Sequence, residues 1–94
     1  MTIRALVVDD EPLARKRMKR LLKDHPDVEV CGEAASGDEA VNQVLALRPQ
    51  VVFLDVNMPG RTGTEALRSI HLALPEELRP EVIFTTAYEQ HALE

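Results

Sequence analysis

Three aspartates and a threonine stand where they could bind a metal ion and a phosphoryl group. Each of them follows a short apolar run: Asp9, Asp10, Asp55 and Thr86. In open α/β folds, ligand sites lie just outside the carboxyl ends of the parallel strands. A carboxylate in such a place is either a ligand for a cation or a nucleophile, and Asp55 alone does not decide between the two.

The four residues together favour one chemistry. Neighbouring carboxylates raise one another's pKa, so three unpaired acids in one place are costly. A divalent cation removes that cost, and Mg²⁺ prefers carboxylate oxygens, a carbonyl and several waters. A carboxylate beside Mg²⁺ is also placed to attack a phosphoryl group in line. We therefore expect Asp55 to be a phosphoryl acceptor, with Thr86 donating a hydrogen bond to a phosphoryl oxygen.

Taken singly, these residues also have purely structural interpretations. Asp9 fits a helix cap or a solvated turn, and Thr86 fits an ordinary strand end. The combined pattern, in which every acid stands at the end of an apolar run, favours the Mg²⁺ site over these interpretations.

Four apolar segments predict the strands that would position these residues, over residues 3–8, 28–34, 51–54 and 81–85. The run at 51–54 is uninterrupted and lies between Pro49 and Pro59, which is typical of a strand buried on both faces. The alternation of apolar and polar residues in 28–34 is less regular.

Helices are predicted between the strands, over residues 12–23, 36–47 and 64–74. Proline at position 12 suits a first helical turn, and Ser36 with Glu39 matches a capping box. The apolar positions of the first helix are Leu13, Ala14, Met18, Leu21 and Leu22. Residues 88–94 could begin a fourth helix. Strands alternating with helices through short loops predict an α/β domain with a parallel sheet and helices on both faces.

The length of 94 residues allows one small domain, and the composition of the chain limits its partners. Its net charge of −5 argues against nonspecific binding of nucleic acid. A single cysteine, Cys31, cannot form an internal disulfide, which fits a reducing cytoplasm. The longest apolar runs fall far below the roughly 20 residues of a membrane span, so we expect no membrane contact.

The chemistry-bearing residues resemble the receiver domain of two-component response regulators. The resemblance rests on these residues and extends over essentially the whole chain: Asp9, Asp10, Asp55, Met58, Pro59, Gly60, Gly63, Thr86 and Ala87. It implies a flavodoxin-like, or CheY-like, fold with strand order 2-1-3-4-5. Residues 8–15 and 86–88 look most like receivers that precede a LytTR-type DNA-binding domain.

This resemblance implies a role for each site residue. Asp55 would accept phosphate from the phosphohistidine of a sensor histidine kinase. Asp10 would bind Mg²⁺ directly, Asp9 through a water molecule and Asn57 through its backbone carbonyl, while the Thr86 hydroxyl would follow phosphorylation. The chain would then be a phosphoacceptor rather than an enzyme. Its effect on transcription would pass through a DNA-binding domain outside this chain.

The sequence departs from the family in its C-terminal part. Receivers have a fifth strand that ends in a lysine, which pairs with the phosphoryl group, whereas this sequence ends at Glu94 and has no lysine after Lys23. We therefore expect residues 1–94 to form a receiver that is incomplete at its C-terminus, with strand order 2-1-3-4 and weakened phosphoryl transfer to Asp55. Segment 82–85 would be an exposed edge that pairs with a second copy, giving a homodimer or a domain-swapped oligomer.

Two other functions fit parts of the pattern. Phosphatases of the haloacid-dehalogenase class also use an aspartate after a strand and Mg²⁺, but they need a second acid two residues on, where this chain has Asn57. An interaction or dimerisation module that works without phosphorylation is the alternative function. The basic residues of the first helix are expected to be solvated, or to steer a kinase towards the Asp55 edge.

Overall fold

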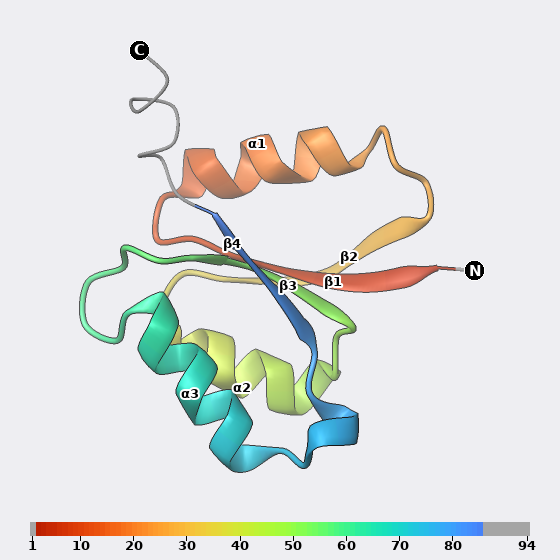
Figure 1. Cartoon of the computed structure of the whole chain (residues 1–94). Coiled ribbons are helices and arrows are strands. Elements are labelled where there is room, and N and C mark those ends of the chain that lie inside the picture. Colours follow the sequence, from red (N-terminus) through yellow and green to blue (C-terminus); the bar gives the residue numbers. More distant parts are fainter. Residues whose placement is uncertain (1, 86–94) are drawn as a thin grey trace.

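A parallel sheet between two layers of helices forms the molecule (Figure 1). The computed structural model describes residues 2–85. Strands and helices alternate along the chain as β1 (Ile3–Val8), α1 (Pro12–Leu22), β2 (Val28–Ala34), α2 (Gly37–Leu47), β3 (Val51–Asp55), α3 (Gly63–Ala73), a 3₁₀ helix η1 (Glu76–Leu78) and β4 (Glu81–Thr85).

The strands lie in the order β2-β1-β3-β4, and all of the pairs are parallel. Helix α1 covers one face of the sheet, and α2 and α3 cover the other (Figure 1). This is the flavodoxin-like order that the resemblance to receiver domains implies. Because β1 and β3 are parallel neighbours, the residues that follow them emerge at the same edge of the sheet.

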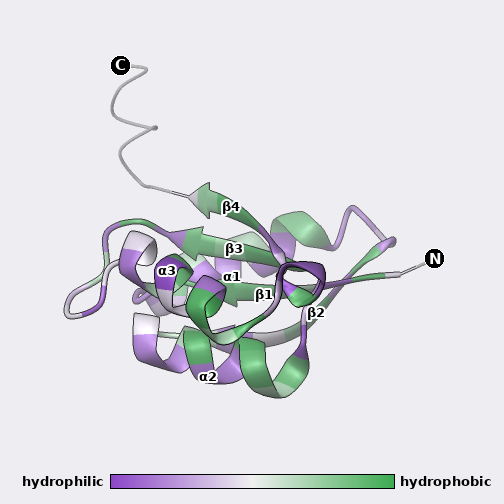
Figure 2. Cartoon of the chain, turned by 60° about the horizontal axis from the view of Figure 1, so that its bottom comes forward, coloured by the Kyte–Doolittle hydropathy of each residue, from purple (hydrophilic) through white to green (hydrophobic). Residues whose placement is uncertain are grey.

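The main core lies between the sheet and the helices α2 and α3. Its largest side chains are fully buried, and they come from both layers: Leu6, Val8, Val44, Val52, Leu54 and Ile70. Figure 2 shows hydrophobic colouring along β3 and β4. Val52 and Leu54 of β3 belong to this core, and Val82 of β4 packs against it. The core therefore fixes the ends of the central strands, where Asp9 and Asp55 are attached.

Helix α1 turns a narrower face towards the sheet than the sequence predicts. Leu22 is buried, but the side chains of Leu13 and Leu21 are 73% and 58% exposed. Positions 14, 18 and 22 repeat every four residues and form one stripe. Leu13 and Leu21 each precede a member of that stripe by one residue, which places them about 100° around the helix. Leu13 and Leu21 are therefore apolar positions of α1 that do not pack on the sheet.

Side-chain caps start α2 and α3. The Ser36 hydroxyl accepts a hydrogen bond from the Glu39 amide, 3.1 Å away, which is one half of the capping box predicted there. The complete box stands at α3, where the side chains of Thr62 and Glu65 each accept from the other's backbone N–H. It fixes the start of α3 beside the end of β3.

Strand β4 is the last strand of the described sheet. Its side chains Ile83 and Phe84 are 49% and 39% exposed. Thr86 and the helix predicted over residues 88–94 lie outside the described residues. None of the helices within residues 2–85 is long and apolar enough to cross a membrane.

Candidate functional site

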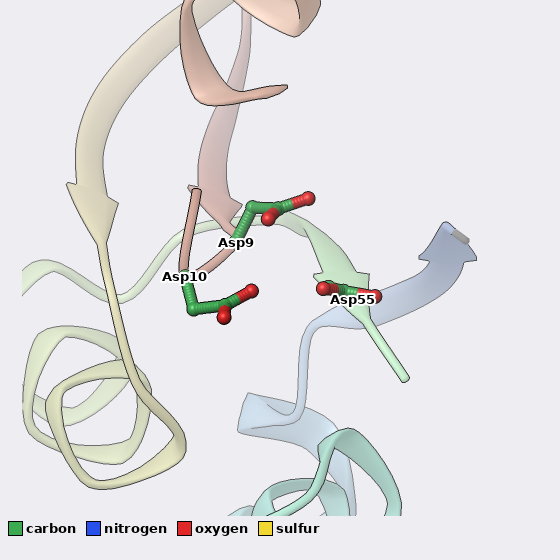
Figure 3. A group of neighbouring side chains, drawn as sticks. All are labelled: Asp9, Asp10 and Asp55. Atoms are coloured by element: carbon green, nitrogen blue, oxygen red, sulfur yellow. The ribbon is translucent and has the colours of Figure 1, made fainter. Parts of the chain in front are cut away.

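Asp9, Asp10 and Asp55 lie together at the carboxyl ends of β1 and β3 (Figure 3). A carboxylate oxygen of each residue lies within 4.8 Å of an oxygen of the other two. Asp55 is the last residue of β3, where it pairs with Thr85 of β4. Asp9 and Asp10 stand in the turn that leads from β1 into α1.

Asp55 is the most confined of the three acids, because its residue surface is only 8% exposed. Its Oδ1 accepts a hydrogen bond from the Asn57 amide at 3.1 Å. Burial raises the pKa of Asp55 from its ordinary 3.8 to about 6, and the nearby charges of Asp9 and Asp10 add to this effect. The hydrogen bond from Asn57 acts in the opposite direction. Asp55 is therefore mostly ionised at neutral pH, in surroundings that disfavour its charge.

Asp9 is fixed mainly through its backbone. Its N–H donates to the carbonyl of Ala34 at 3.1 Å, and its carbonyl accepts from Nη1 of Arg15 at 2.8 Å. The carboxylate accepts from the amide of Glu11 at 3.0 Å. Burial raises the pKa of Asp9, and the charge of Asp10 adds to the rise, while the hydrogen bond from Glu11 opposes it.

The loop after β3 closes tightly against Asp55. The amide of Gly63 donates to the carbonyl of Val56 at 3.1 Å, and a Cβ at position 63 would collide with the backbone carbonyl of Asp55. Met58 is buried in the main core, and Gly60 has a φ of 78°, a left-handed conformation that favours glycine. These features give a structural reason for Met58, Gly60 and Gly63.

A family model for the response regulator receiver domain matches residues 5–94. This chain belongs to that family. The receiver is 43% identical over 91 residues to the transcriptional regulatory protein BtsR of Salmonella typhi, a match that covers 97% of this chain and 36% of BtsR. The chain thus spans about a third of that relative's length.

Solved structures agree with the receiver fold. The response regulator domain of Thermotoga maritima CheB aligns with a TM-score of 0.83 and 35% identity, covering 99% of this chain and 72% of that one. A chain of the CheX-CheY-BeF3-Mg²⁺ complex from Borrelia burgdorferi aligns with a TM-score of 0.80 and 25% identity, covering 97% and 66%. Both comparisons support the strand order of this receiver.

The donor set of the receiver fits a small, hard cation. Three carboxylates face a common space, and burial, with a further contribution from the neighbouring acids, raises the pKa of Asp9 and Asp55. Mg²⁺ takes oxygen ligands of this kind. The roles predicted for the Asn57 carbonyl and for Thr86 stay predictions, since the observed contact of Asn57 is through its N–H and Thr86 lies outside the described residues.

Arg15 also belongs to this region, which the sequence pattern does not indicate. The pattern predicts Arg15 to be one of the basic residues of the first helix that are solvated or steer a partner. In the structure the Arg15 side chain is only 18% exposed and reaches the backbone of Asp9. Its position five residues after Asp10, on a helix with five basic residues between positions 15 and 20, does not distinguish it from its neighbours.

Proposed function

We propose that Asp55 is the phosphoacceptor of a two-component response regulator and that a sensor histidine kinase is the donor. The observation that carries the proposal is the burial of the Asp55 carboxylate beside Asp9 and Asp10, at the edge of a receiver fold. The hydrogen-bond donor that contacts the Asp55 carboxylate within residues 2–85 is the Asn57 amide. The carboxylate is positioned to react with a ligand that brings compensating positive charge.

In the proposed transfer, the phosphorus–nitrogen bond of the donor phosphohistidine breaks. A bond forms between phosphorus and a carboxylate oxygen of Asp55, and the ring nitrogen keeps the electron pair of the broken bond. Asp55 attacks as the carboxylate, which predominates above a pKa of about 6. The Asn57 amide fixes the carboxylate orientation during the attack, because it donates to Oδ1. The Thr86 hydroxyl would donate to a phosphoryl oxygen.

We propose that Asp10 and Asp55 bind Mg²⁺ directly, with Asp9 acting through water and Asn57 through its carbonyl. When bound, Mg²⁺ neutralises charge on the phosphoryl oxygens. The short separations of the three carboxylates support this set. The similarity to a chain of the CheX-CheY-BeF3-Mg²⁺ complex also supports this set of ligands.

We further propose that the receiver acts in the cytoplasm on transcription, through a LytTR-type DNA-binding domain outside this chain. The similarity to BtsR, a transcriptional regulatory protein much longer than this chain, supports an output of that kind. The net charge of −5 is consistent with a receiver that leaves DNA binding to another domain.

The test of the phosphoacceptor is covalent labelling by a small donor with a phosphorus–nitrogen bond, such as phosphoramidate, followed by intact mass spectrometry. We expect labelling only in the presence of Mg²⁺, slow and with at most one phosphoryl group per chain, and none after Asp55→Asn. Asp24→Asn removes an exposed acid from the turn after α1 and should leave labelling unchanged. Labelling that survives Asp55→Asn would contradict the assignment.

A dimerisation module is the second candidate function, and the exposed side chains of β4 favour it. Ile83 and Phe84 present apolar surface at the last strand of the described sheet. Exposed edges of this kind pair with other strands unless they carry charges or a cover. We propose that two copies associate through this strand.

Sedimentation velocity tests the dimer. Ile83→Lys places a charge on the edge and should shift the chain towards monomer. The matched variant Leu72→Lys changes a leucine of α3 that is 81% exposed and should leave the dimer intact. A chain that sediments as a monomer without any substitution would refute the dimer while leaving the phosphoacceptor proposal untouched.

A further inference from the structure

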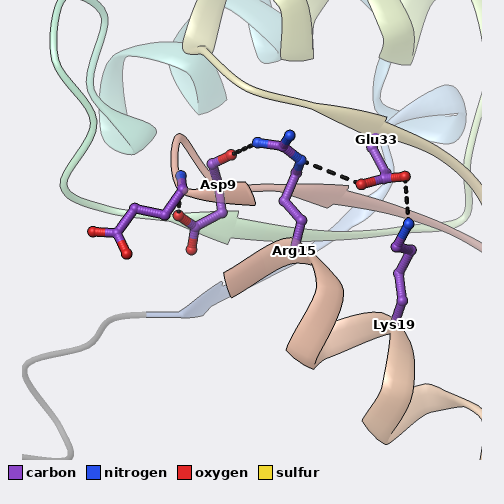
Figure 4. A network of polar contacts seen from close by, with 5 residues as sticks. Asp9, Arg15, Lys19 and Glu33 are labelled. Carbon is purple, nitrogen blue, oxygen red and sulfur yellow. Dashed lines mark hydrogen bonds and ion pairs between the residues drawn. The ribbon is translucent and has the colours of Figure 1, made fainter. Parts of the chain in front are cut away.

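Arg15 joins the backbone of Asp9 to the end of β2 (Figure 4). Its Nη1 donates to the carbonyl oxygen of Asp9 at 2.8 Å, and its Nε donates to Oε1 of Glu33 at 3.2 Å. The second oxygen of Glu33 accepts from Nζ of Lys19 at 2.7 Å. One carboxylate of β2 therefore holds two basic side chains of α1, and one of these holds the turn that carries Asp9.

The guanidinium group is suited to this bridge. Its donors lie in one plane at fixed angles, so it can hold a carbonyl and a carboxylate at the same time. The Lys19 hydrogen bond, with a smaller contribution from Arg15, lowers the pKa of Glu33, which keeps Glu33 ionised at neutral pH. The Arg15–Glu33 pair is partly buried, and it holds the guanidinium group in the orientation that reaches the Asp9 carbonyl.

The turn between β1 and α1 needs such support because Asp9 and Asp10 belong to neither element. The Asp9 N–H is fixed by Ala34, and the Glu11 amide is fixed by the Asp9 carboxylate. Arg15 adds the contact to the Asp9 carbonyl, on the opposite side of the residue from its N–H. The backbone at Asp9 is thus held from β2 and from α1 at the same time.

We propose that Arg15 is a positioning residue that fixes the Asp9–Asp10 turn, and that Glu33 orients Arg15 for this task. Its consequence for metal affinity rests on the Mg²⁺ site proposed above, whereas its consequence for the turn does not. Arg15 contacts the backbone carbonyl of Asp9 and the carboxylate of Glu33. It acts by holding the acids in place before Mg²⁺ arrives.

Amide hydrogen exchange in metal-free protein tests the positioning role. In Arg15→Met we expect the amides of Asp9 and Glu11 to exchange about tenfold faster, because each lies in a hydrogen bond that depends on the fixed turn. Arg17→Met makes the same chemical change on the exposed side of α1 and should leave both amides unchanged. Equal exchange in the two variants would overturn the proposal.

Mg²⁺ titration by calorimetry tests the link to the site. We expect Arg15→Met to weaken Mg²⁺ binding by about tenfold, the lower end for loss of a residue that supports metal ligands. Arg15→Lys should fall in between, because an ammonium group lacks the planar fork. The double variant Arg15→Met/Glu33→Gln should bind Mg²⁺ no more weakly than Arg15→Met, since Glu33 acts through Arg15.

The two measurements separate the possible failures. Additive losses in the double variant would overturn the role of Glu33. An unsubstituted chain that binds no Mg²⁺ would refute the proposed metal site, and the exchange rates would still decide whether Arg15 fixes the turn. If Arg15→Met fails to fold, Arg15→Lys and Glu33→Gln provide the same comparison, and wild-type exchange in both of them would overturn the proposal.

Discussion

The backbone N–H of Asn57 donates to Oδ1 of Asp55 at 3.1 Å, and this hydrogen bond opposes the burial that raises the Asp55 pKa. Burial prevails, because the pKa settles at about 6. An asparagine side chain at position 55 would offer the same acceptor oxygen to the Asn57 amide. Asp55→Asn therefore removes the buried charge while it keeps the contact, which separates electrostatics from geometry.

We predict that Asp55→Asn stabilises the metal-free chain at neutral pH. The folded-state pKa of Asp55, about 6, lies above the ordinary 3.8 of an unfolded chain, so the ionised carboxylate destabilises the folded state. The cost is fully present above pH 6 and disappears below about pH 4. At about 1.4 kcal/mol per pKa unit, the gain in the free energy of unfolding should reach about 3 kcal/mol at pH 7.

Urea denaturation in the presence of a chelator, at pH 7 and at pH 4, measures this gain. The difference between Asp55→Asn and the unsubstituted chain should shrink towards zero at pH 4. Asp24→Asn controls for the loss of one negative charge, since Asp24 lies exposed in the turn after α1. A gain that is equal at both pH values would show that the buried charge is not its cause.

We predict that Mg²⁺ stabilises the folded chain and that Asp10→Asn removes most of the effect. A ligand at a hundred times its Kd that binds only the folded state adds about 2.7 kcal/mol to the free energy of unfolding. Binding should weaken as the pH falls through about 6, because protonation of Asp55 removes a ligand charge. Thermal melts with Mg²⁺, against NaCl of matched ionic strength, test this. A rise that Asp10→Asn leaves intact would place the Mg²⁺ elsewhere.

The bounds of the strands follow from features that the sequence carries locally, whereas their order was implied by the resemblance to receiver domains. Strands β1, β2 and β4 have the predicted bounds, because apolar runs between turn-forming residues leave little choice of where a strand begins or ends. Strand β3 extends one residue further than predicted, since the pairing of Asp55 with Thr85 is a contact between distant segments. For the same reason the periodicity of α1 did not tell which of its leucines would meet the sheet.

The meeting of the three aspartates was predictable because parallel neighbouring strands end at one edge. The contacts around the three aspartates were not predictable from the sequence. The hydrogen bond from Arg15 to the Asp9 carbonyl depends on the distance between α1 and the β1 turn, which no local pattern encodes. The spacing of Thr62 and Glu65 is also that of a capping box, and the structure places the complete box there rather than at Ser36.

Gly63, the first residue of α3, lies against the backbone at the end of β3. A methyl group at this position would meet the backbone carbonyl of Asp55, and backbone atoms cannot move aside as a flexible side chain can. Its amide also donates to the Val56 carbonyl at 3.1 Å. The space left by glycine therefore sets where Asp55 stands relative to α3.

We predict that Gly63→Ala lowers both stability and Mg²⁺ affinity, because it pushes α3 away from the end of β3 and displaces Asp55. Overpacking of this kind costs about 1–3 kcal/mol in the free energy of unfolding. Gly60→Ala is the matched variant. Position 60 has open space but a φ of 78°, so alanine there should cost about 1 kcal/mol of backbone strain and leave Mg²⁺ affinity unchanged. Urea denaturation and Mg²⁺ calorimetry on both variants measure the two effects. If Gly63→Ala loses stability but binds Mg²⁺ as tightly as Gly60→Ala, the close approach of α3 does not position Asp55.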